Sequence, residues 1–245
     1  MYSLFNPENF HKIIIKISGE FLSGERGFGI DVPTVNNLLD DIISVKKLGF
    51  SLGIVLGGGN FFRGVSELGA LIPRYTADNV GMLATIQNAL ILASLLEKRN
   101  YGTEIYSAVQ VDKVAKFYTP NRAITSLNEG KICFFCAGTG NPFFTTDTAA
   151  VLRAVEINAN LVLKGTKVDG VYTDDPVKNP NAKFIQEITY DEVLTKQLNV
   201  MDMTAFSLAR DNKMPIKVFN ITKSGNMKKA VLEKDFGTFI HSKEV

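Results

Sequence analysis

Short stretches of continuous apolar residues alternate with stretches of helical periodicity along this 245-residue chain. The apolar stretches are rich in Val, Ile and Phe, and several end in glycine or a small polar residue. Strands that are apolar on both faces are typical of a parallel sheet covered by helices on both sides. We therefore predict a single α/β domain, a three-layer αβα sandwich around a mostly parallel central sheet. The expected strands are residues 12–18, 52–56, 104–108, 131–137, 161–164, 216–220 and 238–240; the expected helices are 31–48, 77–97, 121–128, 146–158, 202–211 and 226–234; residues 168–182 are expected to form a loop.

The composition is that of a soluble globular protein, with 45% apolar and 21% charged residues. A net charge of +2, without a basic cluster, argues against bulk binding to nucleic acid or to an anionic membrane. The apolar run at residues 13–15 is too short for a signal peptide, and we expect no membrane-spanning segment and a cytoplasmic location. The expected helix 77–97 is apolar nearly all round between residues 89 and 96, which favours deep burial or a subunit interface.

Cys133 and Cys136 have the C-x-x-C spacing of some metal and redox sites. In a strand, however, an offset of three residues directs the two side chains to opposite faces. His11 and His241, at the two ends of the chain, are the sole histidines. We therefore expect neither a zinc site nor a redox pair here.

Glycine and small polar residues gather where the expected strands end. Because the carboxyl ends of parallel strands meet at one edge of the sheet, residues 18–19, 57–60, 138–141 and 164–166 are expected to line one crevice. The run from Cys136 to Arg153 adds a strand, a Gly/Thr/Asn/Pro turn and a helix start in succession. Free N–H groups and the positive end of a helix dipole at one point suit an anionic ligand.

Several enzyme classes lack their sequence signatures here. The chain has no G-x-x-x-x-G-K-[ST], no G-x-G-x-x-G that opens a helix and no G-x-S-x-G, and two histidines leave little for acyl-transfer triads. Backbone amides, a few cations and scattered aspartates remain. That inventory fits phosphoryl transfer, in which catalysis is mainly positioning and neutralisation of charge.

Two cations are candidates for phosphate binding. Lys16 lies near the end of the first expected strand, where its ammonium either reaches solvent or meets an anion at the sheet edge, and we favour the anion. The second expected strand ends in Gly57-Gly58-Gly59-Asn60 and is followed by Arg63. The glycines permit close approach of a phosphate or simply a tight turn, and a guanidinium can bind phosphate through two hydrogen bonds.

Three aspartates lie near expected helix starts, where the dipole or a capping role explains a carboxylate. Asp78 is alternatively an acceptor for both hydroxyls of a ribose. Asp147 would repel a bound phosphate unless it holds a lysine or a metal, whereas Asp202 is expected to be mainly a cap. Thr145 and Thr146 are either caps or ligand-binding hydroxyls, and the turn at residues 174–176 is expected to be mainly solvated.

Several segments resemble the uridylate kinases, a branch of the amino acid kinase family. The resemblance runs in order from about residue 12 to residue 240, and the G-T-G-N-P-F-F-T-T-D element is typical of the uridylate kinases in particular. The matching segments are Lys16-Ile-Ser-Gly-Glu20, Val55-Leu-Gly-Gly-Gly-Asn-Phe-Phe-Arg-Gly64, Asp78-Asn-Val-Gly-Met-Leu-Ala-Thr85, Ala137-Gly-Thr-Gly-Asn-Pro-Phe-Phe-Thr-Thr-Asp-Thr148, Lys164-Gly-Thr-Lys-Val-Asp-Gly-Val-Tyr172 and Val200-Met-Asp202.

The resemblance implies transfer of the γ-phosphoryl group of Mg·ATP to UMP, giving UDP and ADP on the de novo pyrimidine route to CTP. It implies that residues 10–150 bind UMP and residues 151–245 bind ATP, that Mg²⁺ comes with ATP, and that no side chain ligates the metal. Lys16 and Asp147 would be catalytic. ATP would contact Lys16, Ile17, Ser18, Gly19, Gly59, Arg63, Thr166, Tyr172 and Asp175; UMP would contact Gly58, Asp78, Thr139, Gly140, Asn141, Pro142, Phe143, Phe144, Thr145 and Thr146.

The resemblance also implies a homohexamer that GTP activates and UTP inhibits. The loop associated with activation by GTP would comprise Gly24, Glu25, Arg26, Gly27, Phe28 and Gly29. Two other readings stay open from the residues alone: a kinase of the same scaffold acting on a carboxylate or carbamate, and a non-catalytic nucleotide binder. Lys16 and Asp147 together argue against a pure binder, and the missing glycine fingerprint argues against a dehydrogenase.

Overall fold

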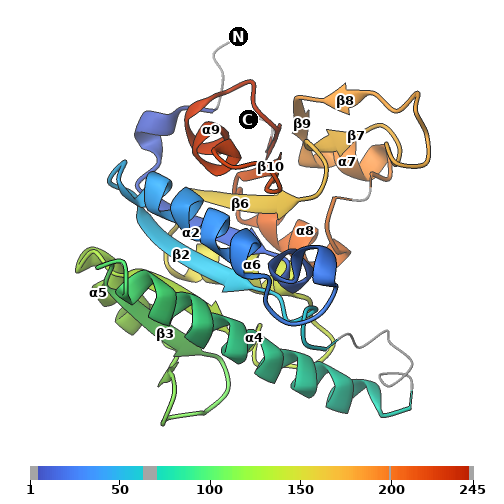
Figure 1. Cartoon of the computed structure of the whole chain (residues 1–245). Coiled ribbons are helices and arrows are strands. Elements are labelled where there is room, and N and C mark those ends of the chain that lie inside the picture. Colours follow the sequence, from blue (N-terminus) through green and yellow to red (C-terminus); the bar gives the residue numbers. More distant parts are fainter. Residues whose placement is uncertain (1–4, 63–70, 199, 243–245) are drawn as a thin grey trace.

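A computed structural model describes residues 5–62, 71–198 and 200–242. A nine-stranded sheet forms the centre of the molecule, in the order β4-β3-β5-β2-β1-β6-β10-β11-β9 (Figure 1). Its neighbours pair in parallel except β10 and β11, which are antiparallel. The strands are β1 (Lys12–Ile17), β2 (Ser51–Leu56), β3 (Thr103–Ser107), β4 (Lys116–Phe117), β5 (Ile132–Cys136), β6 (Leu161–Thr166), β9 (Glu187–Thr189), β10 (Ile216–Asn220) and β11 (Thr238–His241). The prediction of a mostly parallel sheet is confirmed.

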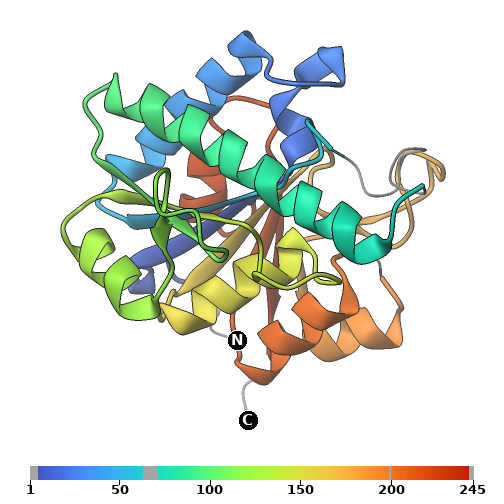
Figure 2. The same ribbon diagram turned by 90° about the horizontal axis from the view of Figure 1, so that it is seen from below.

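Helices cover both faces of this sheet, which confirms the predicted three-layer, single-domain arrangement (Figure 2). One face carries α2 (Val32–Lys46), α4 (Arg74–Glu97) and α9 (Asn226–Leu232); the other carries α5 (Pro120–Asn128), α6 (Thr146–Glu156), α7 (Tyr190–Thr195) and α8 (Met203–Asp211). Within a strand, alternate residues enter the two cores. Ile13, Ile15 and Ile17 of β1 enter the core under α2, and Ile14 enters the core under α6.

The expected loop at residues 168–182 is only partly correct. It contains β7 (Val171–Tyr172), which pairs antiparallel with β8 (Phe184–Ile185) to form a small separate hairpin. The segment after it holds β9 and α7, which the apolar pattern does not indicate. Thr189 and Glu192 form a capping box at the start of α7, so the S/T-x-x-E spacing was the available signal.

The helix expected at residues 77–97 begins one turn earlier, at Arg74, with Pro73 as its N-cap. Asp78 therefore lies in the second turn, and a first-turn interaction with the dipole does not explain it. By length and composition α4 would also pass for a membrane-spanning helix, contrary to expectation, although 44% of its apolar window is buried. Its buried residues pack on β3 and β5, as a core helix of a soluble fold would.

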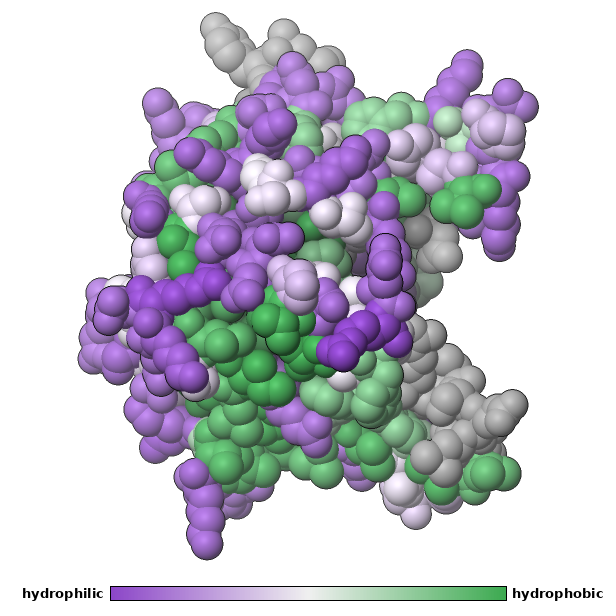
Figure 3. Space-filling view, in the orientation of Figure 1, coloured by the Kyte–Doolittle hydropathy of each residue, from purple (hydrophilic) through white to green (hydrophobic). Residues whose placement is uncertain are grey.

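The solvent side of α4 remains partly apolar. Val80 and Leu83 are exposed there, and apolar surface gathers over this helix in the space-filling view (Figure 3). Of the two alternatives for residues 89–96, burial holds for Ala89, Leu92, Ala93 and Leu96, and a subunit interface along this helix stays a prediction.

The cysteines behave as their spacing predicts. Cys133 lies in the core beneath α6 and Cys136 in the core beneath α4, on opposite faces of β5. Burial raises the pKa of both thiols to about 12, so they stay protonated and unreactive near neutral pH.

Candidate active site

Two lysines converge on one carboxylate at the carboxyl edge of the sheet. The Nζ atom of Lys16 lies 2.9 Å from Oδ1 of Asp147, in an ion pair without the angles of a well-directed hydrogen bond. The Nζ atom of Lys164 donates to Oδ2 of the same residue at 2.5 Å and to the carbonyl oxygen of Val200 at 2.6 Å. The two ammonium groups thus flank a single aspartate, and all three side chains are almost fully buried.

The sheet register brings the two lysines together. β1 and β6 are parallel neighbours, and Lys16 faces Lys164 directly across the pair. Both side chains leave the sheet on the side covered by α6, because residues at equal register on adjacent strands share a face. Asp147 enters between them from the first turn of α6, where the dipole favours its charge.

Electrostatics keep this carboxylate ionised. Burial opposes the charge of Asp147, but the ammonium groups of Lys16 and Lys164 outweigh that cost and hold the pKa of the carboxyl below its usual range. Burial also lowers the pKa of Lys164, as does the Lys16 ammonium, while Asp147 opposes the change. Asp147 is therefore an organiser of two cations at neutral pH and is poorly suited to accept a proton.

Asp202 ties the starts of two helices together. It caps α8 by accepting from the amide of Ala205 at 3.0 Å, which confirms the expected cap. It also accepts from the hydroxyls of Thr145 and Thr148, the latter at 3.0 Å. Thr145 in turn caps α6, since its hydroxyl accepts from the amides of Asp147 and Thr148. Of the two readings for Thr145, the structure shows the cap.

The glycines of the crevice are needed for close packing between backbones. A Cβ atom on Gly19 would lie 2.6 Å from both the carbonyl oxygen of Gly57 and the amide of Gly59. One on Gly58 would lie 2.6 Å from the carbonyl oxygen of Gly81 in α4. The start of α1 (Gly19–Leu22), the end of β2 and helix α4 are thereby pressed together. Ser18 and Gly19 stand at the N-terminus of α1, beside Lys16.

The loop after β5 has an unusual backbone. Ala137 and Phe143 are both left-handed, with φ of 59° and 74°, as are Gly138 and Gly140. Left-handed backbone in non-glycine residues is costly and is concentrated at functional sites. The amide of Phe143 donates to Oδ2 of Asp78 at 2.7 Å, so this loop is joined to α4.

A cavity of about 140 Å³ lies between α4 and this loop. Most of the residues expected to bind UMP line it, namely Gly58, Asp78, Thr139, Asn141, Phe144, Thr145 and Thr146; Gly59, expected at ATP, also lines it. Gly140, Pro142 and Phe143 belong to the same loop, without lining the cavity.

The residues expected around ATP are spread more widely. Thr166 ends β6, and its hydroxyl donates to the carbonyl oxygen of Val168 at 2.7 Å. Tyr172 lies in the small hairpin, where its ring meets that of Phe184 edge-on. Asp175 stands in an exposed turn and accepts from the amide of Val177 at 3.0 Å, in line with the expected solvated turn. Arg63 lies outside the described residues.

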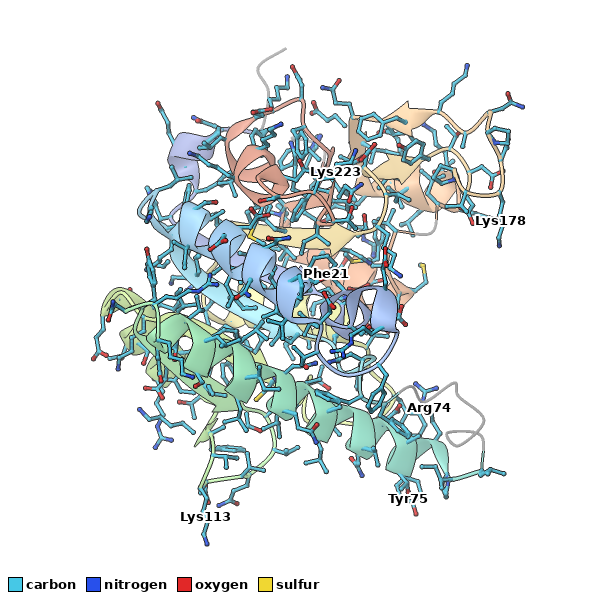
Figure 4. All side chains as sticks on the ribbon, viewed as in Figure 1. Phe21, Arg74, Tyr75, Lys113, Lys178 and Lys223 are labelled. Carbon is cyan, nitrogen blue, oxygen red and sulfur yellow. The ribbon has the colours of Figure 1, made fainter. Side chains whose placement is uncertain are left out.

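The expected GTP loop is attached to the glycine-rich turn. The amide of Gly29 donates to the carbonyl oxygen of Asn60 at 2.8 Å, and the Asn60 side chain donates to the carbonyl oxygen of Gly29 at 2.9 Å. A cavity of about 520 Å³ lies between α1, α2 and the segment after β10, and Gly24 and Glu25 line it together with Phe21, Asp41 and Lys167. None of the expected ATP or UMP contacts lines this larger cavity. Figure 4 labels Phe21 at its border.

Two charged residues of the site were given no role from the sequence: residue 164 was expected only as part of the crevice lining at 164–166, and Arg74 was not considered. Lys164 is a lysine inside an apolar strand, the same signal that pointed to Lys16. Arg74 donates through Nε to both carboxylate oxygens of Asp78, at 2.8 and 2.9 Å. Arg74 and Asp78 are four residues apart in α4, a spacing at which side chains pair. This pair could not be predicted because the helix was expected to begin after Arg74.

Residues 11–220 match the model of a family described as "Amino acid kinase family". The chain belongs to the amino acid kinase family. Among solved structures, its fold is similar to that of a UMP kinase from Bacillus anthracis, at 36% identity and a TM-score of 0.92, over 96% of this chain and 97% of that one. It is also similar to a UMP kinase from Ureaplasma parvum, at 38% identity and a TM-score of 0.90, over 96% and 100% of the two chains. Membership in the amino acid kinase family supports a phosphotransferase role, as does the likeness to UMP kinases.

The donor set shows how a metal would relate to this site. Among residues 5–62, 71–198 and 200–242, no group of three or more His, Cys, Asp or Glu side chains is placed to hold a metal ion. Both oxygens of Asp147 already face ammonium groups. This amino acid kinase site therefore fits a Mg²⁺ ion carried on the phosphates of a nucleotide, since Mg²⁺ keeps few protein ligands in such sites.

Proposed function

We propose that this protein is a UMP kinase, which transfers the γ-phosphoryl group of Mg·ATP to UMP and yields ADP and UDP. The observation that carries the proposal is the pair of buried ammonium groups, Lys16 and Lys164, held side by side by Asp147 at the glycine-lined edge of the sheet. Likeness to bacterial UMP kinases over almost the whole chain supports the choice of acceptor.

The reaction needs little covalent help from the protein. An oxygen of the UMP phosphate attacks the γ-phosphorus, the bond from that phosphorus to the β,γ-bridging oxygen breaks, and the electron pair leaves on ADP. The attacking oxygen carries no proton to remove in the dianion, because the second pKa of a phosphate monoester is about 6. The main barrier is to bring two polyanions together, so cations and amides carry the catalysis.

The residues divide this work. Lys16 and Lys164 offset the negative charge on the transferring group and on the leaving ADP, and Asp147 keeps both ammonium groups aimed at the same point. The amides of Ser18 and Gly19, at the start of α1, suit the phosphates of ATP. A Mg²⁺ ion that arrives with ATP would supply further neutralisation of the phosphate charge.

The crevice at the sheet edge offers neighbouring places for the two nucleotides. We propose that UMP occupies the cavity between α4 and residues 138–146, and that ATP extends from Gly19 and Gly59 toward Thr166, Tyr172 and Asp175. The cavity, about 140 Å³, is smaller than usual ligand pockets of roughly 300–1,000 Å³, so we expect it to widen when UMP binds.

The wider setting follows from the same family. We propose that the protein acts in the cytoplasm in pyrimidine nucleotide synthesis, as a homohexamer activated by GTP and inhibited by UTP. Contact of residues 24–29 with the turn at Asn60 supports a route from that loop to the phosphate site. The apolar residues exposed on α4 support an interface between subunits.

One assay tests the acceptor. ADP release from Mg·ATP is measured with UMP, CMP, dUMP, carbamate and N-acetylglutamate, each offered alone. Fast turnover is expected with UMP only. Turnover only with carbamate or the carboxylate would assign the chain to a different branch of the amino acid kinase family, and binding of nucleotide without turnover would favour a non-catalytic binder.

A further inference from the structure

An arginine side chain and a backbone amide both donate hydrogen bonds to the carboxylate of Asp78. Nε of Arg74 lies 2.8 Å from Oδ1 and 2.9 Å from Oδ2, and the amide of Phe143 donates to Oδ2 at 2.7 Å. The guanidinium of Arg74 also lies 5.7 Å from the centre of the Phe143 ring. Figure 4 shows Arg74 and Tyr75 leaving the start of α4 in different directions, with Tyr75 pointing away from the sheet.

These contacts use most of the capacity of the carboxylate. An ionised aspartate offers about four acceptor positions, and three are taken here. Both positions on Oδ2 are occupied, whereas Oδ1 receives a single bond. One acceptor position on Oδ1 is therefore left for a hydroxyl. The direction of that position depends on the orientation in which Arg74 holds the Asp78 carboxylate.

The Arg74–Asp78 pair is a weak candidate for a purely stabilising role. The Arg74 side chain is 59% exposed, and exposed ion pairs contribute little to stability. Asp78 itself is only 18% exposed and lines the cavity proposed for UMP. The Arg74–Asp78 ion pair contributes little to folding and lies at the border of the cavity proposed for UMP. We therefore look for its role in substrate binding.

We propose that Arg74 is a positioning residue that aims the free acceptor position of the Asp78 carboxylate at a ribose hydroxyl of the acceptor nucleotide. Discrimination between a ribonucleotide and a deoxyribonucleotide at this site then depends on Arg74 as well as on Asp78. The pairing also offsets the negative charge of Asp78, which would otherwise repel the phosphate of the incoming nucleotide. The inference rests on the proposed function, because it assigns the ribose of UMP to this cavity.

The test compares kcat/KM for UMP and for dUMP in matched variants. Arg74→Gln should lower the UMP/dUMP ratio about tenfold, the loss of one charge-assisted hydrogen bond, mainly through a higher KM for UMP. Asp78→Asn should lower the ratio as well, and adding Arg74→Gln to it should change the ratio no further, since Arg74 acts through Asp78. Arg74→Lys keeps the charge without the Nε geometry and should restore part of the ratio.

Arg99→Gln is the matched control. Arg99 follows the other end of α4 and pairs with Asp40 at 2.8 Å, far along the helix from the cavity. It should keep the wild-type ratio. General destabilisation would lower both kcat/KM values together and leave their ratio unchanged.

The outcomes separate the two proposals. A wild-type chain without turnover on UMP overturns the proposed function and this inference with it. A wild-type chain that is active but uses dUMP as well as UMP, or an Arg74→Gln variant that keeps the wild-type ratio, overturns this inference alone.

Discussion

At the scale of single residues, Lys16 combines an unfavourable location with a precise partner. It lies near the carboxyl end of β1 among buried isoleucines, and its ammonium lies against Asp147 rather than in solvent. The cost of that burial is understandable if the charge is needed for the transferring phosphoryl group.

Lys16→Ala should therefore lower kcat by about 100-fold or more while the affinity for UMP changes much less. Lys12→Ala is the control, because Lys12 lies on the same face of β1 but donates to the carbonyl oxygen of Ile157 at 2.6 Å, away from the site. Steady-state kinetics and calorimetric binding of UMP check the prediction. Equal losses in turnover and binding would show that Lys16 serves ground-state binding.

Asp147 is the residue whose removal should affect folding as well as turnover. In Asp147→Asn two buried ammonium groups keep only an amide between them, so the free energy of unfolding should fall by about 3 kcal/mol. Urea denaturation monitored by circular dichroism measures it. Asp40→Asn removes an exposed carboxylate paired with Arg99 and should change stability by less than about 1 kcal/mol; similar losses in the two variants would contradict this account.

At the scale of secondary-structure elements, a buried pair of amides joins α4 to the glycine-rich turn. Asn60 and Asn88 exchange hydrogen bonds of 2.7 and 2.9 Å, and Asn88 also donates to the carbonyl oxygen of Gly57 at 2.8 Å. Both residues are almost fully buried, so each lost bond leaves a polar group without water.

Asn88→Ala should lower the free energy of unfolding by about 2 kcal/mol, through unpaired groups on Asn60 and Gly57. Gln87→Ala, on the exposed side of the same helix, should have little effect. Because the turn carries Gly58 and Gly59, the Asn88 variant should also raise the KM for both nucleotides. Thermal unfolding and steady-state kinetics check both effects. A lower unfolding temperature in Asn88→Ala with unchanged KM values would show that the pair serves stability alone.

The elements also show how far sequence reasoning reaches. Apolar runs identified the strands that line the site because each is buried on both faces, and their loops do share one edge. Residue 164 was placed at the crevice, but the role of its ammonium was not predicted because it depends on β6 pairing with β1, a contact between segments almost 150 residues apart that periodicity does not encode. The start of α4 was misplaced by one turn because Arg74, Tyr75 and Thr76 have no apolar pattern, so the Arg74–Asp78 pair went unseen.

At the scale of the whole molecule, another buried lysine, Lys217, lies outside the candidate active site and gives stability a pH dependence. Lys217 of β10 is fully buried, its Nζ atom 4.0 Å from the centre of the Phe5 ring, and it donates to the carbonyl oxygen of Lys234 at 2.7 Å. Burial lowers its pKa from 10.5 to about 8, although Asp235 and Glu187 oppose the change.

The number of protons bound by the native and the unfolded chain decides whether stability rises or falls with pH. Between about pH 8 and pH 10.5 the unfolded chain holds a proton on Lys217 that the native chain has released, so stability rises with pH in that window. The free energy of unfolding of the wild type relative to Lys217→Met should therefore increase by about 2 kcal/mol from pH 7 to pH 10. Urea titrations of both proteins across this pH range measure the difference between their free energies of unfolding. The buried tyrosines are present in both proteins, so their contribution cancels. A flat difference would show that Lys217 stays charged in the native state.

The direct register between Lys16 and Lys164 makes the chemistry sensitive to the count of residues as well as to their identity. Side chains alternate between the two faces of a strand, so one inserted or deleted residue ahead of either lysine within its strand would swing that ammonium to the opposite layer, away from Asp147. Length changes should accordingly be tolerated in the surface connections and rejected within β1 and β6, even when every charged side chain is retained.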